Sequence, residues 1–299
     1  MDIRDLTIFA TVAKTGSMTR AAEQLDYVQS NITARIQHME NKLGTTLFHR
    51  LPRRLTMTSS GEKLLKYAEK ILHLYNEAEY AIQDSETPSG SLRIGAMETT
   101  TATRLPTILA KYHEAFPDVE FFLSTGPTEQ LIDSVLNYHI EAALVAGPVN
   151  HPSLEEVAVI QEELVLVSSL NSMNPTMMRD QPTALVFREG CSYRKRLEQY
   201  LNHTGLQSKH VIELGTLDGI LGCAAAGLGV SLVPRNVVDK GRFQLAVNKI
   251  PDEFGKVPTV LVRRKDGYIS SALAKFIETV KFNSQSETVD TSMPMELKS

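Results

Sequence analysis

Residues 17–58, SMTRAAEQLDYVQSNITARIQHMENKLGTTLFHRLPRRLTMT, decide how the N-terminal part of this chain folds. Ser17 is a good N-cap for a short helix over 18–25, and residues 26–28 are short enough for a tight turn. A further helix is predicted over 29–43, because apolar residues recur at spacings of 4, 3 and 4 and Gly44 can end it. Two short helices joined by a tight turn are typical of a helix-turn-helix, whose second helix enters the major groove of DNA.

The segment after Gly44 predicts a two-stranded hairpin, or wing. Leu47-Phe48 leads into a basic stretch, and the alternating residues 55–58 form the returning strand. Pro52 lies between two basic clusters, which suits the tip of a wing that faces phosphates or a narrow minor groove.

The predicted reading helix has a polar face opposite its apolar residues. Gln29 and Asn31 can form paired hydrogen bonds with adenine edges, and Ser30 and Thr33 can reach bases or phosphates. Arg35 lies at the flank, where it is better placed for the DNA backbone. The predicted DNA-binding residues are Thr19, Gln29, Ser30, Asn31, Thr33, Arg35, Arg50, Pro52, Arg53 and Arg54. The alternative is a small helical bundle with a solvated polar face.

The stretch that follows favours a long helix to about Asp84, opened by the capping-box signature SSGE at 59–62. Its apolar residues repeat at 4, 3, 4, 3, 4, a heptad seam narrower than an ordinary core face. The seam consists of Leu64, Ala68, Ile71, Tyr75, Ala78 and Ile82.

From residue 91 strands and helices alternate, which predicts an α/β body with a parallel sheet. Two similar halves, starting with strands at 91–96 and 163–168, favour a two-lobed domain with a cleft between the lobes. A last strand, 257–263, and helix, 269–281, can return to the first lobe. The predicted divisions are a winged helix-turn-helix over 1–58, a dimerisation linker helix and hinge over 59–90, a two-lobed domain over 91–282, to which the family resemblance described below assigns effector binding, and a polar, disordered tail over 283–299.

Composition limits the class of protein. The chain has 299 residues, and no apolar run of about 18 residues predicts a membrane span, so a cytoplasmic protein is expected. Residues 1–66 hold 10 basic and 6 acidic side chains, whereas the remainder holds 21 and 29, so only the N-terminal part favours a polyanion. Cys191 and Cys223 fit no zinc or CxxC motif and are interpreted as free thiols, with a redox role for Cys191 as the alternative. The sequence shows no cofactor or catalytic motif, so an enzyme is disfavoured, and the basic head opposes a transport solute-binding protein.

The run from Phe9 to Leu65 resembles the LysR-type transcriptional regulators. The match rests on AAEQL, Gln29, Ile36, Glu40, LGTTLFHR, Thr56 and SSGE, which stand in the family's order and spacing. The resemblance implies a homodimer or homotetramer whose linker helices pair antiparallel, double-stranded DNA and a small-molecule effector as partners, and no membrane partner. It also implies a periplasmic-binding-protein-like body with the effector between its lobes. Val28 and Ala34 depart from the family, which often has Ser as the cap of the reading helix and Arg at the later position.

The implied effector pocket lies where strand ends meet helix starts. Hydroxyls and free backbone N–H groups at helix starts bind anions, although plain N-capping explains the same residues. A small polar or anionic effector is therefore expected, with Arg194 as a counter-charge and Glu98 and Glu189 as unfavourable neighbours. The predicted effector-binding residues are Thr99, Thr100, Gly126, Thr128, Ser192 and Arg194.

Overall fold

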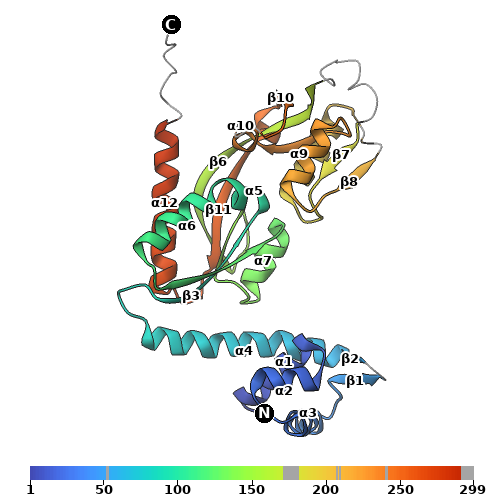
Figure 1. Ribbon diagram of the computed structural model, residues 1–299, viewed down its shortest axis with the longest axis vertical. Helices are drawn as coiled ribbons and strands as arrows, with labels where there is room; N and C mark the ends of the chain where they lie inside the picture. Colours follow the sequence, from blue (N-terminus) through green and yellow to red (C-terminus); the bar gives the residue numbers. More distant parts are fainter. Residues whose placement is uncertain (52–53, 171–181, 207, 209, 240–241, 291–299) are drawn as a thin grey trace. The chain divides into compact units, whose positions relative to one another are not determined.

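The computed structural model describes residues 1–51, 54–170, 182–206, 208, 210–239 and 242–290 (Figure 1). The chain divides into two compact units, Met1–Gln83 and Asp84–Ser299, each with its own core. Among the described residues, no helix is both long and apolar enough to cross a bilayer.

The N-terminal unit contains the predicted helix-turn-helix and wing. Ser17 Oγ accepts a hydrogen bond from the N–H of Arg20, which caps the second helix. Gly44 ends the third helix with φ of 65°, in the left-handed region that favours glycine. The elements are α1 (Ile3–Thr15), α2 (Met18–Leu25), α3 (Gln29–Leu43), β1 (Phe48–Leu51), β2 (Arg54–Met57) and α4 (Ser59–Gln83) (Figure 1).

The start of α4 belongs to the core of this unit. Ala68 is fully buried there, and Leu64, Leu65 and Leu72 pack against the same cluster as the apolar faces of α1 and α3. Gly61 makes this close approach possible, because a Cβ at that position would lie 2.3 Å from the carbonyl oxygen of Leu47. The folded head therefore extends beyond the predicted boundary at residue 58.

The start of α4 is capped one residue earlier than the sequence suggested. The hydroxyl of Thr58 accepts from the N–H of Gly61 at 3.0 Å and donates to the carbonyl of Thr46 at 2.8 Å. Thr58 thus caps α4 and ties its start to the chain that enters the wing.

The first lobe of the second unit combines an early and a late part of the chain. Strand β3 pairs in parallel with β4 and β5, as the alternating pattern predicted, whereas β11 pairs antiparallel with β5. Helix α12 lies beside α6, where the Tyr112 hydroxyl donates to the carbonyl of Ala272 at 2.9 Å (Figure 1). The elements are β3 (Gly90–Ala96), α5 (Glu98–Thr103), α6 (Leu105–Ala115), β4 (Val119–Thr125), α7 (Thr128–Leu136), β5 (Ala142–Ala146), β11 (Lys256–Arg264) and α12 (Ser271–Asp290).

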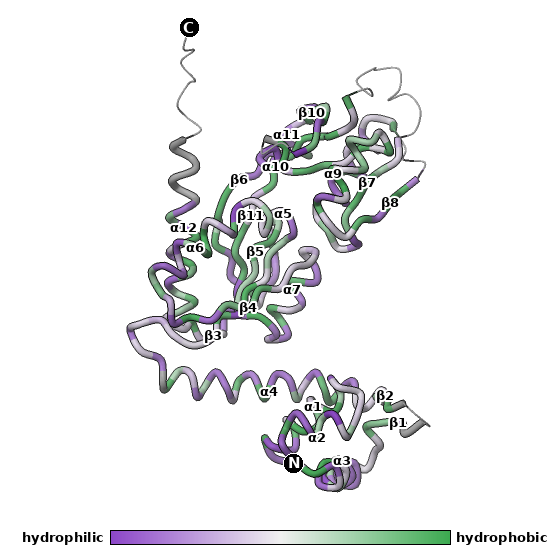
Figure 2. The backbone as a smooth tube through the Cα atoms, in the orientation of Figure 1, coloured by the Kyte–Doolittle hydropathy of each residue, from purple (hydrophilic) through white to green (hydrophobic). Residues whose placement is uncertain are grey.

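The second lobe is inserted between β5 and β11 and shares two strands with the first. Strand β6 pairs with β11 from Leu154 to Glu163 and then with β9 and β10 from Leu164 to Ser169. The elements of this part are β6 (Leu154–Ser169), β7 (Ala184–Val186), α8 (Ser192–His203), β8 (Val211–Glu213), α9 (Leu217–Ala225), β9 (Ser231–Pro234), α10 (Arg235–Asp239), β10 (Leu245–Lys249) and α11 (Asp252–Gly255). Figure 2 shows hydrophobic colour along β6, in keeping with the burial of its second half.

Several sequence expectations for this unit were wrong. The sheet is mixed rather than parallel, because β6, β9, β10 and β11 pair antiparallel. The alternating pattern did not show that two helices, α5 and α6, meet at Arg104 between β3 and β4, and β10, α10 and α11 were not predicted. The tail expected from 283 is helical as far as Asp290, and Asn283 accepts a hydrogen bond from Lys111; residues 291–299 lie outside the described residues.

Candidate functional site

The turn between α2 and α3 leads into a helix without a side-chain cap. Asp26 ends α2 with φ of 56°, and Val28 occupies the N-cap position of α3 but offers no hydrogen bond. Its apolar side chain is 72% exposed. The first N–H groups of α3 therefore lack the cap that a serine or threonine supplies.

The predicted base-reading residues lie together at this end of α3. Gln29, Ser30 and Asn31 are exposed, as is Thr19 on α2, while Thr33 is half-buried and donates to the carbonyl of Gln29 at 3.0 Å. The arrangement presents one polar helix start, the part of a recognition helix that contacts base edges.

Arg35 has a role within the protein that the sequence did not predict. Its guanidinium donates to the Asp5 carboxylate at 2.7 Å and lies 3.9 Å from Asp2, which joins α3 to α1. Burial alone would raise the pKa of Asp5, but the hydrogen bonds from Arg35 and the Asp2 backbone hold that pKa below its ordinary value. Arg35 therefore positions the reading helix, and its contact with DNA remains a prediction.

The wing is attached to the far end of α3. The Glu40 carboxylate accepts from the N–H groups of Leu47 and Phe48 at 2.8 and 3.3 Å. The strand register pairs Leu51 with Arg54, and the predicted tip residues are Pro52 and Arg53. Both tip residues lie outside the described residues, and only the backbone of Arg50 and Arg54 is described.

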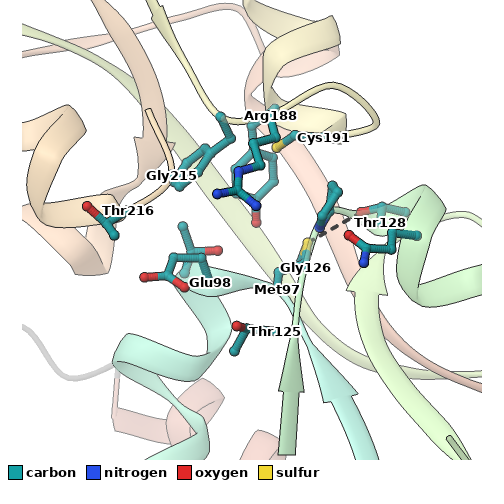
Figure 3. A pocket seen from close by; sticks show the side chains of 14 residues that line it. Met97, Glu98, Thr125, Gly126, Thr128, Arg188, Cys191, Gly215 and Thr216 are labelled. Atoms are coloured by element: carbon teal, nitrogen blue, oxygen red, sulfur yellow. Dashed lines mark hydrogen bonds between the residues drawn. The ribbon is translucent and has the colours of Figure 1, made fainter. Parts of the chain in front are cut away.

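The second unit contains a cavity of about 350 Å³ where the two lobes meet (Figure 3). That volume lies in the range of small-molecule sites. Its lining residues are Met97, Glu98, Thr99, Thr125, Gly126, Pro127, Thr128, Gln130, Phe187, Arg188, Cys191, Tyr193, Gly215 and Thr216.

Helix starts surround this cavity. Pro127 and Cys191 are the N-cap residues of α7 and α8, and neither supplies a side-chain cap, whereas Thr216 caps α9 by accepting from the N–H of Gly219. Neither helix start has a side-chain cap, so each directs the positive end of a helix dipole toward the cavity, although the N–H of Glu129 in the first turn of α7 already donates to the carbonyl of Gly190 at 3.4 Å. Gly126 keeps this space open, because a Cβ there would lie 3.1 Å from Oε1 of Gln130.

Two opposite charges point into the same space. Figure 3 shows the guanidinium of Arg188, which follows β7, and the carboxylate of Glu98, which begins α5, directed into the cavity. Among the described residues, neither group has a hydrogen bond or ion pair. Gly215 lies beside Arg188, and a Cβ there would be in ordinary van der Waals contact with the guanidinium, at 3.4 Å.

Two further side chains on this wall are neutral. Burial, with Glu162 nearby, raises the pKa of Tyr193, so its phenol stays protonated and can donate a hydrogen bond. Burial also raises the pKa of the Cys191 thiol, which disfavours the thiolate that redox chemistry needs. Thr128 donates to the sulfur of Met97 at 3.5 Å.

The structure brings together half of the predicted effector residues. Thr99, Gly126 and Thr128 line the cavity. Thr100 is buried and Ser192 is half-buried, and neither is a lining residue. Arg194, the predicted counter-charge, does not line this cavity; it pairs with Glu198 and Glu213, both at 3.1 Å.

The sequence also missed the cation that does face the cavity. Arg188 stands alone after a short strand, and no local pattern marks it. Arg188 and Thr128 line the same cavity because β6 and β11 bring the two lobes together.

A winged helix-turn-helix head joined to a two-lobed body with a cavity defines a class of DNA-binding regulators that carry an effector domain. Residues 3–62 match the family model "Bacterial regulatory helix-turn-helix protein, lysR family", and residues 85–283 match "LysR substrate binding domain". The chain belongs to the LysR family of transcriptional regulators, which are not enzymes.

Relatives of similar length support this assignment. The chain is 43% identical over 298 residues to the HTH-type transcriptional regulator GltR of Bacillus subtilis (strain 168), covering 98% of this chain and 100% of that protein. It is 41% identical over 283 residues to the HTH-type transcriptional regulator CzcR of Bacillus anthracis, covering 94% and 97%. The crystal structure of full-length CbnR with its target DNA shares the fold at a TM-score of 0.68 and 24% identity, covering 95% of this chain and 100% of that one.

Proposed function

We propose that this regulator responds to a small polar effector with an anionic group, bound in the cavity between the lobes. One observation carries the proposal: Arg188 and the uncapped starts of α7 and α8 face one cavity. Backbone N–H groups, helix dipoles and a guanidinium all stabilise negative charge. The hydroxyls of Thr99 and Thr128 supply further hydrogen bonds.

The effector would act by favouring one of two arrangements of the body. A ligand changes DNA affinity only if it binds two states of the protein with different affinities. Because β6 and β11 run through both lobes, a change in their curvature would open or close the cavity with no change in either core.

On DNA, we propose that Gln29, Ser30 and Asn31 read bases while the wing arginines contact the backbone. Two reading helices are needed for a quasi-palindromic operator, and the exposed apolar face of α4 offers a dimer contact. A homotetramer would add a second pair of the same contacts.

The test uses full-length protein and a duplex selected from a random DNA pool on that protein. Small carboxylates and phosphates are titrated while DNA affinity is measured by fluorescence anisotropy. An active compound should lose potency roughly tenfold or more in Arg188→Gln, the usual effect of losing a charge-assisted hydrogen bond. Basal DNA binding should be unchanged.

Arg194→Gln is the matched control, because it removes the same charge from a residue that pairs outside the cavity. An Arg188→Gln protein that responds at the wild-type concentration would show that the effector binds elsewhere.

A further inference from the structure

Two charges of opposite sign that have no partner among the described residues face one cavity, and together they restrict the effector more than an anion site does. Arg188 comes from the second lobe and Glu98 from the first, and both line the cavity. Glu98 is half-buried, so bringing an anion against it would cost desolvation with no compensating contact. A cation alone would instead face Arg188 and the uncapped start of α7.

A ligand that carries both charges satisfies both groups. Its carboxylate can accept hydrogen bonds from Arg188 and from the N–H groups at the starts of α7 and α8. Its ammonium can donate to Glu98 and to the hydroxyls of Thr99 and Thr125, which line the same wall. Met97 and Phe187 then offer an apolar surface to the rest of the molecule.

We propose that the effector is a small zwitterion with a primary ammonium and a carboxylate, that is, a free amino acid. This inference rests on the proposed function, because it assigns the ligand class of the same cavity. The cavity of about 350 Å³ has room for on the order of ten non-hydrogen atoms. That size fits a free amino acid.

Glu98 is the residue that sets this specificity. Acetylation of the ammonium would leave the Glu98 carboxylate desolvated and unpaired, whereas the carboxylate end of the ligand would bind as before. Sites built to bind a polar group discriminate strongly against analogues that lack it. We expect the N-acetyl derivative to bind at least about a hundredfold more weakly than the parent amino acid.

The experiment uses the full-length protein and three matched sets of probes: the proteinogenic amino acids, their N-acetyl derivatives, and the amines that lack the carboxylate. Thermal unfolding identifies probes that bind, and calorimetry gives their affinities. At least one amino acid should bind, and both of its derivatives should bind far more weakly. In Glu98→Gln, the preference for the parent over the N-acetyl form should fall by roughly tenfold or more.

Glu189→Gln is the control variant, because it removes the same charge next to Arg188 from a residue that does not line the cavity. It should keep the wild-type preference. The Arg188→Gln protein should lose affinity for the amino acid, whereas its affinity for the amines should not fall, because the substitution removes a like charge that faces them.

Different results would overturn different claims. If N-acetyl amino acids or simple carboxylates bind best, with affinities that fall in Arg188→Gln but not in Glu98→Gln, the zwitterion inference fails and the anion-binding cavity stands. If a ligand binds to Arg188→Gln and to Glu98→Gln with the same affinity as to the wild type, the zwitterion inference and the proposed anion-binding cavity both fail. If no amino acid binds, or if Glu98 and Arg188 pair directly when a ligand is bound, the zwitterion inference is wrong.

Discussion

At the scale of single residues, the contact between Asp5 and Arg35 holds the reading helix against α1. Replacing Asp5 with alanine removes this ion pair and one half of the capping box with Asp2. The free energy of unfolding of the N-terminal unit should fall by about 2 kcal/mol. Hydrogen exchange of the α1 and α3 amides in the full-length protein measures this loss locally.

The same contact predicts a pH dependence. Because the folded protein holds the pKa of Asp5 below 3.8, its contribution is fully present above that pH and is lost as the pH falls through the folded-state value. The difference between wild type and Asp5→Ala in thermal unfolding should therefore be constant near neutrality and shrink below about pH 4. Glu23→Ala, at an exposed carboxylate on α2, should show no such difference. Equal hydrogen-exchange protection of the α1 and α3 amides in the wild type and in Asp5→Ala would contradict the role given to Asp5.

Base reading and backbone binding should separate in measurements on Gln29 and the wing. Gln29→Ala should cost roughly 1–3 kcal/mol on the selected operator, concentrated at one base pair, and little on random DNA. Arg53→Ala with Arg54→Ala should instead weaken binding to all sequences and lower the salt slope by about one unit per lost phosphate contact. Equal losses for Gln29→Ala on operator and random DNA would assign that side chain to the backbone.

Single residues also show where sequence reasoning stops. Ser17, Gly44 and the polar start of α3 were predictable, because caps and helical periodicity act over a few positions. Arg188 was not, since a lone arginine after a strand looks like any surface cation. Arg194 was chosen in its place because it stands in the first turn of α8, but Glu198 one turn later pairs with it.

At the scale of elements, the apolar seam of α4 is partly buried in the head and partly exposed. Ala68 is buried in the head, whereas Ile71, Tyr75 and Ile82 are exposed, Ile82 by 86%. Figure 2 shows hydrophobic and hydrophilic residues alternating along this helix. The heptad pattern predicted the helix and its apolar face, but it could not show which positions the head would bury.

The exposed part of the seam predicts a dimer contact. Ile71 is 41% exposed in the single chain, so Ile71→Glu should leave the head folded and place a charge in the interface. Sedimentation of Ile71→Glu should show a monomer, and its circular dichroism spectrum should match that of the wild type. Lys66→Glu, on the opposite side of α4, should remain a dimer, while Ala68→Glu should unfold the head. A dimer of normal stability for Ile71→Glu would place the interface on another surface.

Strand β6 was the element predicted least well. Only its second half has the continuous apolar run of a buried strand, whereas the first half, LEEVAVIQEE, mixes charges with apolar residues. This first half of β6 forms a strand because it pairs with β11, about a hundred positions further along the chain. No local sequence pattern reveals that pairing.

At the scale of the whole molecule, the residue that follows α4 is fixed to the body. The Asp84 carboxylate accepts from the Ser271 N–H and hydroxyl at 2.8 and 2.7 Å and from the Tyr268 hydroxyl at 2.8 Å. These contacts attach the hinge to the first turn of α12. We expect a change in the first lobe to reach the covalent connection to the DNA-binding head through this attachment.

Asp84→Ala should uncouple the two functions. Effector and DNA should each bind with nearly wild-type affinity, but the coupling free energy between them, typically 1–3 kcal/mol, should fall toward zero. The measurement is DNA affinity with and without a saturating probe that binds the cavity. Ser85→Ala, which removes only a local hydrogen bond to Thr87, is the control. Full coupling in Asp84→Ala would show that the signal passes by another route.

The late position of β11 and α12 in the chain has a consequence for protein synthesis. A ribosome completes the head after the first 83 residues, while the first lobe still lacks the strand that lies between β5 and β6. That lobe can close only when residues 256–290 emerge. A nascent or prematurely terminated chain would thus carry a folded DNA-binding head on an unfinished body, able to occupy an operator and unable to respond to any metabolite.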